Sequence, residues 1–317
     1  MNQEKILKET RSLFIIILVA FLLKVTLIEA YIVPTGSMEK TIMIGDFLIG
    51  NRFVYGMRTP DWIGIPYTDI GFDIPYYRFP KFREPKQGDV IIFKYPRDPH
   101  LKYVKRCIAE PGDTLEIRNR IVYINGSEFK LPEHGRFILP IAAPQQKDPN
   151  IFMGKGNKDH FNKTVLPKQG NRIPIGPETA LLVMQLMIMD GHELTLINKD
   201  GEYHFTMTDP ADLYRRKGSY EVFDAYYPNG NLLNPWSKNM PRGELFFDGQ
   251  PIMELQEYAV EQNYYWAMGD NRDNSLDSRF WGFIPENYML GEALFAYMSL
   301  NLDTWVPRFN RIGTVIR

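Results

Sequence analysis

The chain has 317 residues, which is enough for a membrane anchor plus one substantial domain, or for one domain with a large insertion. Its formal net charge of −1 argues against nucleic acid and against a strongly charged partner. A single cysteine, Cys107, excludes an internal disulfide and a cysteine-built metal site. Aromatic residues make up 14% of the chain and prolines number 23, a mixture that favours a loop-rich β protein over a helical bundle.

The first feature along the chain is an apolar segment. The sequence SLFIIILVAFLLKVTLIEAYIV runs from Ser12 to Val33, and its uninterrupted apolar part ends at Leu23. A helix from near Arg11 to Ile28, rising about 1.5 Å per residue, covers roughly the hydrocarbon thickness of about 30 Å. The sequence therefore predicts a cytoplasmic tail at residues 1–11 and a transmembrane signal anchor at residues 12–30.

The charges in the tail predict the orientation of this anchor. Three basic residues precede the apolar segment against two acidic ones. By the positive-inside rule, this excess predicts a cytoplasmic N-terminus and places the rest of the chain outside. A cleavable secretory signal is the alternative, because Ala30 is a small residue after an apolar run. Such a cleavage site needs a second small residue two positions earlier, but Ile28 stands there.

After the anchor, short apolar segments separated by turn residues predict an antiparallel β fold. The expected strands cover residues 46–55, 89–95, 103–109, 114–118, 121–124, 192–198, 202–208, 263–268, 293–298 and 313–316. Asp98-Pro99 is expected to form the turn between the second and third strands, and Asn125-Gly126 the turn after the fifth. The apolar segment 180–189 is half a membrane span and predicts a core helix or strand.

Two segments interrupt this pattern. Residues 58–85 are rich in proline and aromatic residues, which indicates either an aromatic surface at the membrane interface or, the preferred interpretation, packing beneath a long loop. The second segment is polar and irregular. The predicted organisation after the anchor is a first part of the catalytic core, an inserted subdomain and a second part of the core, at residues 31–128, 129–254 and 255–317.

A candidate nucleophile follows the anchor directly. The sequence IVPTGSMEKT places Ser37 between a glycine and a methionine. A serine hydroxyl is a weak nucleophile until a neighbouring base removes its proton. The five histidines lie on expected turns, insertion loops or hairpin strands, and none lies in an obvious partner motif. A lysine is another candidate base, because burial against apolar surface can lower its pKa by several units.

The sequence KYVKRCIAEPGD contains such a lysine, Lys105, on an expected strand. Strand alternation places Tyr103, Lys105 and Cys107 on one face. Periodicity alone favours an ordinary lysine that faces water. A third stretch, MGDNRDNSLDSRFWG at residues 268–282, changes this balance, because so many short polar groups are costly in a core unless they bond one another. Its spacing lacks the glycine and final glutamate of an EF-hand, so we interpret it as an ion-pair network that holds the serine and lysine in place.

Three blocks of the sequence together resemble bacterial type I signal peptidases. They are PTGSM followed by IGDFLI, then KRCIAEPGD, and finally GDNRDNSLDSRFWG, in that family's order and behind an apolar anchor. The resemblance covers roughly residues 24–125 and 262–317. It implies a mainly β, antiparallel catalytic domain with an N-terminal transmembrane helix and a large insertion. It also implies serine endopeptidase activity with no cofactor and no metal.

The resemblance implies a role for each matching residue. Ser37 would be the nucleophile, and neutral Lys105 the general base. The backbone N–H of Ser37 and the hydroxyl of Thr35 would form the oxyanion hole, where one donor is worth about 2.7–4 kcal/mol. The supporting residues would be Ser275, which orients the lysine amine, the ion pair Asp277 and Arg279, and the bracing residues Asp270 and Arg272. The residues that match a shallow apolar substrate site are Tyr31, Val33, Pro34, Met38, Ile42, Tyr103 and Val104.

These implications predict a single-pass enzyme of the cytoplasmic membrane that removes signal peptides from exported preproteins after small residues, on the extracytoplasmic side. Its partners would be preproteins and membrane lipid, with no nucleic acid. Two alternatives remain: a specialised peptidase with the same dyad, and an inactive membrane-anchored member that acts in binding or assembly. The sequence also departs from the family. Thr35 stands where serine is more usual, and Lys40 stands where proline is common.

Overall fold

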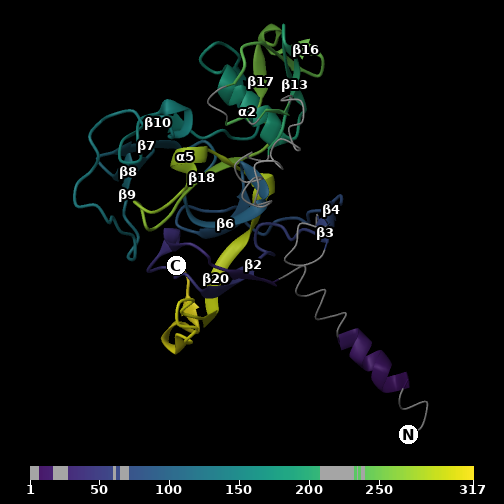
Figure 1. The fold of residues 1–317 in the computed structure, drawn as a ribbon, viewed down its shortest axis with the longest axis vertical. Helices are drawn as coiled ribbons and strands as arrows, with labels where there is room; N and C mark the ends of the chain where they lie inside the picture. The colour runs from purple at the N-terminus through teal and green to yellow at the C-terminus, as the bar shows by residue number, and fades with distance from the viewer. Residues whose placement is uncertain are drawn as a thin grey trace.

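The computed structural model describes residues 7–16, 28–59, 62–64, 71–207, 232–233, 235–236 and 240–317. Within these residues the fold is mainly β, and almost all strand pairs are antiparallel, as the sequence predicts. Figure 1 shows the strands of the N- and C-terminal parts together in the lower half, with a separate group of strands and α2 above them.

The largest sheet joins strands from both ends of the described sequence, in the order β1-β2-β20-β5-β6-β18-β19, with β21 beside β20. Its strands are β1 (Ile28–Ile32), β2 (Asp46–Asn51), β5 (Val90–Tyr95), β6 (Asp98–Ala109), β18 (Tyr264–Met268), β19 (Ile284–Pro285), β20 (Met289–Ser299) and β21 (Thr314–Val315). Side-chain burial alternates along β2, whereas β5 is buried at every position but Lys94, because apolar clusters cover both of its faces.

Smaller sheets carry the middle of the chain. One has the order β10-β7-β8-β9, with bounds Phe161–Val165, Thr114–Arg118, Ile121–Ile124 and Ser127–Phe129. Another has the order β14-β13-β12-β15-β16, with bounds Leu232–Leu233, Gly201–Phe205, Leu194–Asn198, Glu244–Phe247 and Gln250–Pro251. Two further pairs are β11 with β17 (Arg172–Pro174 and Glu257–Ala259) and β3 with β4 (Trp62–Gly64 and Gly71–Asp73).

Short helices connect these sheets. The apolar segment 180–189 forms α2 (Ala180–Asp190), which ends at Gly191 in a left-handed conformation with φ 100°. Further short helices are α5 (Ser278–Trp281) and the 3-10 turns η1 (Gly36–Met38), η2 (Phe152–Gly154), η3 (Ile252–Glu254), η4 (Glu286–Tyr288) and η5 (Phe309–Arg311). Helix α2 buries most of its residues in the largest apolar cluster, together with Trp266 and Phe283, so the middle of the chain packs directly on the second part of the core.

Three local predictions differ from the structure. The expected strand 46–55 ends at Asn51. Asp98-Pro99 is not the turn but the start of β6, since Tyr95 pairs with Asp98 and the two residues between them make the turn. The predicted boundary between residues 128 and 129 falls inside β9, whose sheet also contains β10 from the predicted insertion.

The predicted anchor at residues 12–30 lies largely outside the described residues, which omit 17–27. Residues 7–16 are helical, and Figure 1 shows this helix apart from the body of the protein. In the part of the chain that the structure describes, no helix combines the length and apolar character needed to cross a membrane. The last residues of the predicted anchor, from Ile28, belong to β1 and pair with β2.

The aromatic segment 58–85 does not pack beneath a loop where its side chains are described. Its exposed aromatic residues are Phe72, Tyr76, Tyr77, Phe79 and Phe82, the last of which is 70% exposed. Arg58 lies 3.7 Å over the ring of Tyr76, and Phe82 contacts Phe53. The preferred interpretation of this segment is therefore wrong for these five residues, because their side chains are exposed at the surface rather than packed in a core.

Candidate active site

Ser37 lies in η1, directly after the edge strand β1. Thr35 precedes this turn in an extended conformation, and its hydroxyl makes no capping hydrogen bond to the helix. The loop after β18 holds the turn from the other side. The Asn271 backbone N–H donates to the Ser37 carbonyl oxygen at 3.0 Å, and the Asn271 side-chain amide donates to the Gly36 carbonyl oxygen at 2.9 Å. The position of the serine is thus fixed by a residue more than 230 positions away.

Lys105 reaches this serine from β6. Its Nζ lies 2.8 Å from Ser37 Oγ and 2.9 Å from the Val104 carbonyl oxygen. The side chain is buried, with only 4% of the residue exposed. Burial lowers the pKa of the Lys105 amine to about 8, although the charges of Asp277 and Asp270 act to raise it. A substantial fraction of this amine is therefore neutral near pH 8, and a neutral amine can accept the proton of the hydroxyl beside it.

A first buried ion pair, between Arg106 and Asp270, lies next to Lys105. Arg106 donates from Nε to Asp270 Oδ1 at 2.8 Å and from Nη2 to Asp270 Oδ2 at 2.6 Å. The Thr41 hydroxyl donates to the same carboxylate at 2.6 Å. Asp270 is expected from the sequence to brace this network, and the structure gives it Arg106 as its ion-pair partner. Because Arg106 is adjacent to Lys105 on β6 and Asp270 follows β18, this pair connects the two strands beside the serine turn.

A second buried ion pair lies within the polar loop. Arg279 donates from Nε to Asp277 Oδ1 and from Nη2 to Asp277 Oδ2, both at 2.8 Å. Burial by itself would raise the pKa of the Asp277 carboxyl, but the guanidinium of Arg279 outweighs this effect and the pKa lies below its usual value. The Gly269 backbone N–H also donates to Asp277, at 3.1 Å. The expected ion pair of Asp277 and Arg279 is therefore present, and it holds the chain that leads out of β18.

Ser275 lies close to the serine turn, but its hydroxyl forms no hydrogen bond with the Lys105 amine. Its hydroxyl lies beside the Asp277 carboxylate, whose pKa it helps to lower, but no hydrogen bond of ordinary geometry joins this oxygen to the described residues. The Lys105 amine instead bonds the Val104 carbonyl oxygen. The role of Ser275 in orienting the amine remains a prediction.

Gly269 explains how closely these groups approach one another. A methyl group at this position would lie 2.2 Å from Ser275 Oγ and 2.5 Å from the Ser37 carbonyl oxygen. Both distances are far below van der Waals contact, so only glycine allows the serine turn and the polar loop to pack together. The sequence motif contains this glycine, but no pattern in the sequence reveals that it separates two site residues.

Replacing Gly269 by alanine is expected to push Ser37 out of register and to lower kcat/KM by about 10²-fold, the cost of a displacement on the order of 1 Å. Steady-state cleavage of a peptide substrate measures the effect. Gly176→Ala is the matched control, because a methyl group there meets nothing within 4 Å and the backbone is not left-handed. Equal activity of the two variants would contradict this packing argument.

The residues expected to contact substrate are only partly together. Five of them share one apolar cluster beside the serine turn: Tyr31, Val33, Met38, Ile42 and Val104. Within it, Met38 and Ile42 are fully buried. Pro34 is exposed. Tyr103 belongs to a different cluster, where its ring stacks on Tyr95 with centroids 4.5 Å apart. The same ring also borders the site, because Lys105 Nζ lies 5.1 Å from its centroid.

The turn after the serine has an unusual backbone. Lys40 has φ 79°, a left-handed conformation that the ring of proline cannot adopt. The Ile42 backbone N–H donates to the Met38 carbonyl oxygen at 2.7 Å and closes the turn. Lys40 can therefore adopt this left-handed backbone conformation, whereas the proline that is common at this position in the family could not.

Three polar residues of the site were not assigned a role from the sequence: Thr41, Arg106 and Asn271. The sequence does contain a sign of the role of Arg106. It is a second charged residue on an apolar strand, and such a charge needs a partner of opposite charge if the strand is buried. Thr41 and Asn271 lie inside the quoted blocks, but their partners are distant in sequence. Among the described residues, no group of three or more histidine, cysteine, aspartate or glutamate side chains is arranged to hold a metal ion.

Most of the sequence matches one known protein family. The family model described as "Signal peptidase, peptidase S26" matches residues 6–186 and 213–298, which is most of the chain. The chain belongs to this family. Its membership makes it a serine-type peptidase, and the three blocks that carry the serine, the lysine and the polar loop all lie inside the matched ranges.

Individual members of the signal peptidase family match over nearly the whole chain. Signal peptidase I of Buchnera aphidicola subsp. Acyrthosiphon pisum is 27% identical, over 99% of this chain and 83% of the relative. Signal peptidase I of Aquifex aeolicus is 25% identical, over 98% and 91%, and that of Haemophilus influenzae is 28% identical, over 96% and 74%. A solved signal peptidase I from Enterococcus faecalis V583 matches 66% of this chain and 97% of its own, with 18% identity and a TM-score of 0.25.

Proposed function

We propose that this member of the signal peptidase family is a membrane-bound serine endopeptidase that removes N-terminal signal peptides from exported preproteins after small residues. The observation that carries the proposal is the 2.8 Å contact between Lys105 Nζ and Ser37 Oγ in a buried site. The relatives named signal peptidase I, which align with nearly the whole chain, support the same reaction. An inactive binding scaffold would have no need for a buried amine with a lowered pKa against a serine hydroxyl.

The reaction proceeds in two halves. Ser37 Oγ attacks the scissile carbonyl carbon while the neutral Lys105 amine accepts the hydroxyl proton. Lys105 then gives this proton to the departing amine of the mature protein, the C–N bond breaks, and an ester joins Ser37 to the signal peptide. Water loses a proton to Lys105 and attacks the ester, the bond to Ser37 Oγ breaks, and Lys105 returns the proton to Ser37 Oγ. The Ser37 backbone N–H and the Thr35 hydroxyl, which does not cap η1, would stabilise the oxyanion in both halves.

The substrate binds as an added strand. Strand β1 lies at the edge of the largest sheet and leads directly into the serine turn. An extended peptide alongside it would form backbone hydrogen bonds, and its alternate side chains would point to the apolar cluster of Tyr31, Val33 and Val104. Met38 and Ile42 of the same cluster are fully buried, so a substrate side chain would contact the cluster through its less buried residues.

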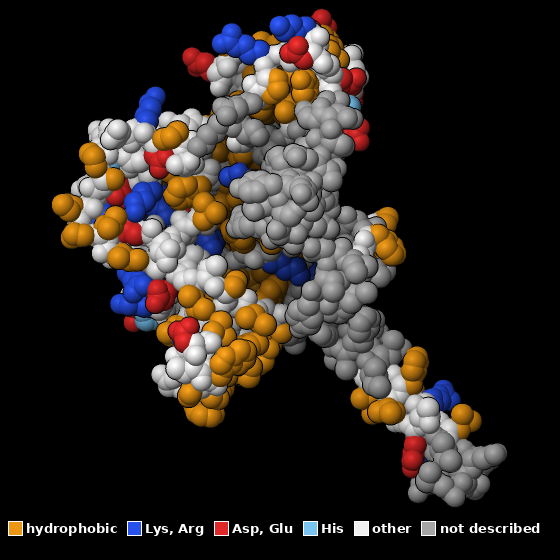
Figure 2. Space-filling model, viewed as in Figure 1, with side chains coloured by type: hydrophobic (Ala, Val, Ile, Leu, Met, Phe, Trp, Pro, Cys, Tyr) orange, Lys and Arg blue, Asp and Glu red, His pale blue; other side chains and the backbone are white. Residues whose placement is uncertain are grey.

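A group of exposed apolar side chains supports the proposal that the enzyme acts at a membrane surface. Figure 2 shows hydrophobic side chains gathered over the lobe that holds the C-terminal residues in Figure 1. The exposed residues of this lobe and the adjoining sheet are Ile32, Phe295, Tyr297, Trp305, Val306, Phe309 and Val315. A single-pass anchor before β1, a cytoplasmic N-terminus and a catalytic domain on the extracytoplasmic side would place this surface against lipid, close to Ser37.

Cleavage of a preprotein tests the proposed function. The full chain, purified in detergent, should cut a preprotein once, and mass spectrometry should place the cut after a small residue at the end of the signal peptide. Ser37→Ala should leave the preprotein intact. An uncleaved preprotein with the parent enzyme, or full cleavage by Ser37→Ala, would contradict the assignment.

The lowered pKa of Lys105 predicts the pH dependence of this reaction. A lysine is charged below its pKa and neutral above it, so the fraction of active base rises with pH. With a pKa of about 8, kcat/KM should increase through neutral pH and level off above about pH 9. A substrate without ionisable groups near the scissile bond removes the contribution of the substrate. A profile that is flat between about pH 6 and 9 would contradict a lysine base.

A further inference from the structure

A short segment of the predicted insertion, residues 136–139, lies against the polar loop that follows β18. A parallel bridge joins Arg136 to Asn271. The Arg136 backbone N–H donates to the Asp270 carbonyl oxygen at 2.9 Å, and the Arg136 carbonyl oxygen accepts from the Arg272 backbone N–H at 2.9 Å. The insertion therefore binds directly to the loop that holds the serine turn.

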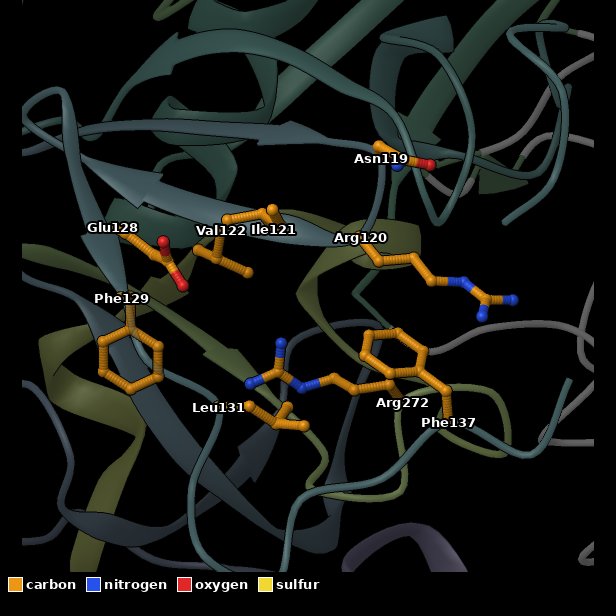
Figure 3. A pocket seen from close by; sticks show the side chains of 9 residues that line it. All are labelled: Asn119, Arg120, Ile121, Val122, Glu128, Phe129, Leu131, Phe137 and Arg272. Carbon is orange, nitrogen blue, oxygen red and sulfur yellow. The ribbon is translucent and has the colours of Figure 1, made fainter. Parts of the chain in front are cut away.

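The same segment is also held on its other side. The backbone N–H groups of Ile138 and Leu139 both donate to Asp273 Oδ2, at 2.8 Å each. Arg120, in the turn between β7 and β8, donates from Nη1 to the Leu139 carbonyl oxygen at 2.9 Å. Figure 3 shows the ring of Phe137 next to the side chain of Arg120, whose guanidinium carbon lies 4.7 Å from the ring centroid. The backbone of Arg136 thus has a fixed position beside the polar loop.

The side chain of Arg136 reaches the serine turn. Its Nη2 donates to Glu39 Oε2, two residues after the nucleophile. The Glu39 carboxylate folds back over the turn, because a methyl group built on Gly36 would lie 3.5 Å from Glu39 Oε2. Asn271 Nδ2 donates a longer hydrogen bond, of 3.4 Å, to the same oxygen. Glu39 therefore connects Arg136 to Asn271.

Asn271 in turn controls one peptide group of the serine turn. Its Nδ2 carries two hydrogens and donates to the Gly36 carbonyl oxygen at 2.9 Å as well as to Glu39. The Gly36 carbonyl and the Ser37 N–H belong to the same planar peptide group and point in opposite directions. Any rotation that moves this carbonyl away from Asn271 turns the Ser37 N–H through the same angle. The groups that hold the Gly36 carbonyl oxygen therefore set the direction of the Ser37 N–H.

We propose that Arg136 and Glu39 are positioning residues for the oxyanion hole. Through Asn271 they keep the Ser37 N–H directed at the carbonyl oxygen of the substrate. This role rests on the proposed function, in which that N–H stabilises the oxyanion. Lys105 Nζ keeps its own bonds to Ser37 Oγ and the Val104 carbonyl oxygen, so the pair acts on the oxyanion hole and not on the base. The insertion thereby contributes to catalysis.

An ordinary surface ion pair is the alternative. The side chains of Arg136 and Glu39 are 29% and 38% exposed, and ion pairs with this exposure usually contribute little to stability. A positioning role predicts a loss of catalysis with little loss of stability. Arg172 and Glu257, on β11 and β17, form an exposed ion pair that serves as the matched control.

Cleavage kinetics of the full chain in detergent test this role. Arg136→Met and Glu39→Met each remove one charge and keep an apolar side chain, and each should lower kcat about tenfold with KM unchanged, because a displaced oxyanion donor weakens the transition state alone. The midpoint of the pH profile should stay in place. A direct effect of the lost charges on the oxyanion would have opposite signs in the two variants. The double variant should be no slower than either single variant, and Arg172→Met should match the parent.

A peptide aldehyde reports on the oxyanion hole itself. Ser37 Oγ adds to the aldehyde carbon, the π electron pair moves to oxygen, and Lys105 takes the hydroxyl proton, which places that oxygen at the oxyanion position. The inhibition constant of the aldehyde should rise about tenfold in both variants, whereas that of the matching peptide alcohol should not change. Partial unfolding would lower the active fraction without separating the two inhibitors.

Hydrogen exchange followed by mass spectrometry tests the geometry without any cleavage. Peptides that cover residues 34–39 and 269–275 should exchange faster in Arg136→Met and Glu39→Met than in the parent, while a peptide from β5 should not. Faster exchange together with a parent that cleaves no preprotein would contradict the proposed function and leave the contacts confirmed. With an active parent, unchanged exchange, a kcat within about twofold of the parent, opposite effects of the two single variants, or an additive loss of about 100-fold in the double variant would overturn the positioning role.

Discussion

Replacing Lys105 by methionine is expected to lower kcat/KM by about 10²–10⁴-fold, the usual contribution of a positioned general base. Methionine is close to lysine in length and apolar, so it fills the space between β6 and the serine turn without a buried charge. Ser37 would keep its position through the hydrogen bonds from Asn271, but no group would accept its proton. The loss should therefore appear in catalysis while thermal unfolding of the protein changes little.

A second substitution of Lys105 distinguishes the effect of its positive charge from its ability to accept a proton. Lys105→Arg keeps a cation of similar reach, but a guanidinium stays protonated and cannot act as a base. It should be as inactive as Lys105→Met. Lys163→Met, on the exposed face of β10, makes the matched control and should retain full activity. Retained activity in Lys105→Arg would exclude a neutral amine as the base.

Replacing Asp277 by alanine is expected to lower the free energy of unfolding by about 3–5 kcal/mol, the cost of leaving one member of a buried ion pair alone. Asp277 and Arg279 are both almost fully buried, and the carboxylate also accepts a hydrogen bond from the Gly269 backbone. Its loss would leave the Arg279 guanidinium buried and uncompensated. Since Gly269 contacts the serine turn, kcat/KM should fall as well.

Two comparisons make this prediction specific. In the double variant Asp277→Ala with Arg279→Ala, no charge is left unpaired, so the stability loss should be smaller than the sum of the two single losses. Glu257→Ala breaks an exposed ion pair with Arg172 and should cost only about 0–1 kcal/mol. Denaturant unfolding followed by tryptophan fluorescence measures the parent, the two single variants, the double variant and Glu257→Ala. A loss in Asp277→Ala no larger than in Glu257→Ala would show that the buried pair contributes little.

The sequence predicted the strands well and the contacts between them less well. Alternation and turn residues identified most strands of the largest sheet, because each has a local apolar pattern. The ion-pair partner of Asp270 was not predicted: Arg272 is nearer in sequence, whereas the structure uses Arg106 from a different strand. Which of two arginines reaches a carboxylate depends on how strands pair across long distances, and no local pattern encodes that.

Lys105 is also more buried than the alternation of residues along its strand predicts. Two consecutive charged residues, Lys105 and Arg106, suggest a strand with one face in water. Both are buried because the two faces of β6 are covered. One apolar cluster packs on the face of Tyr103 and Cys107, and the face of Val104 and Arg106 meets the cluster of the serine turn and Asp270 of the polar loop. Only the three blocks taken together predicted that the lysine and the serine meet. The exposure of the aromatic residues in segment 58–85 could not be predicted, since the same composition suits a core or a surface.

The largest sheet pairs β2 with β20, and the loop after β18 holds the serine turn. During synthesis, the ribosome therefore releases the nucleophile long before it releases the strands that fix its position. A nascent chain that ends before β20 has a serine and a lysine but lacks the strand that joins β2 to β5. Such a chain should be unable to cut other proteins, so the topology delays activity until synthesis is almost finished.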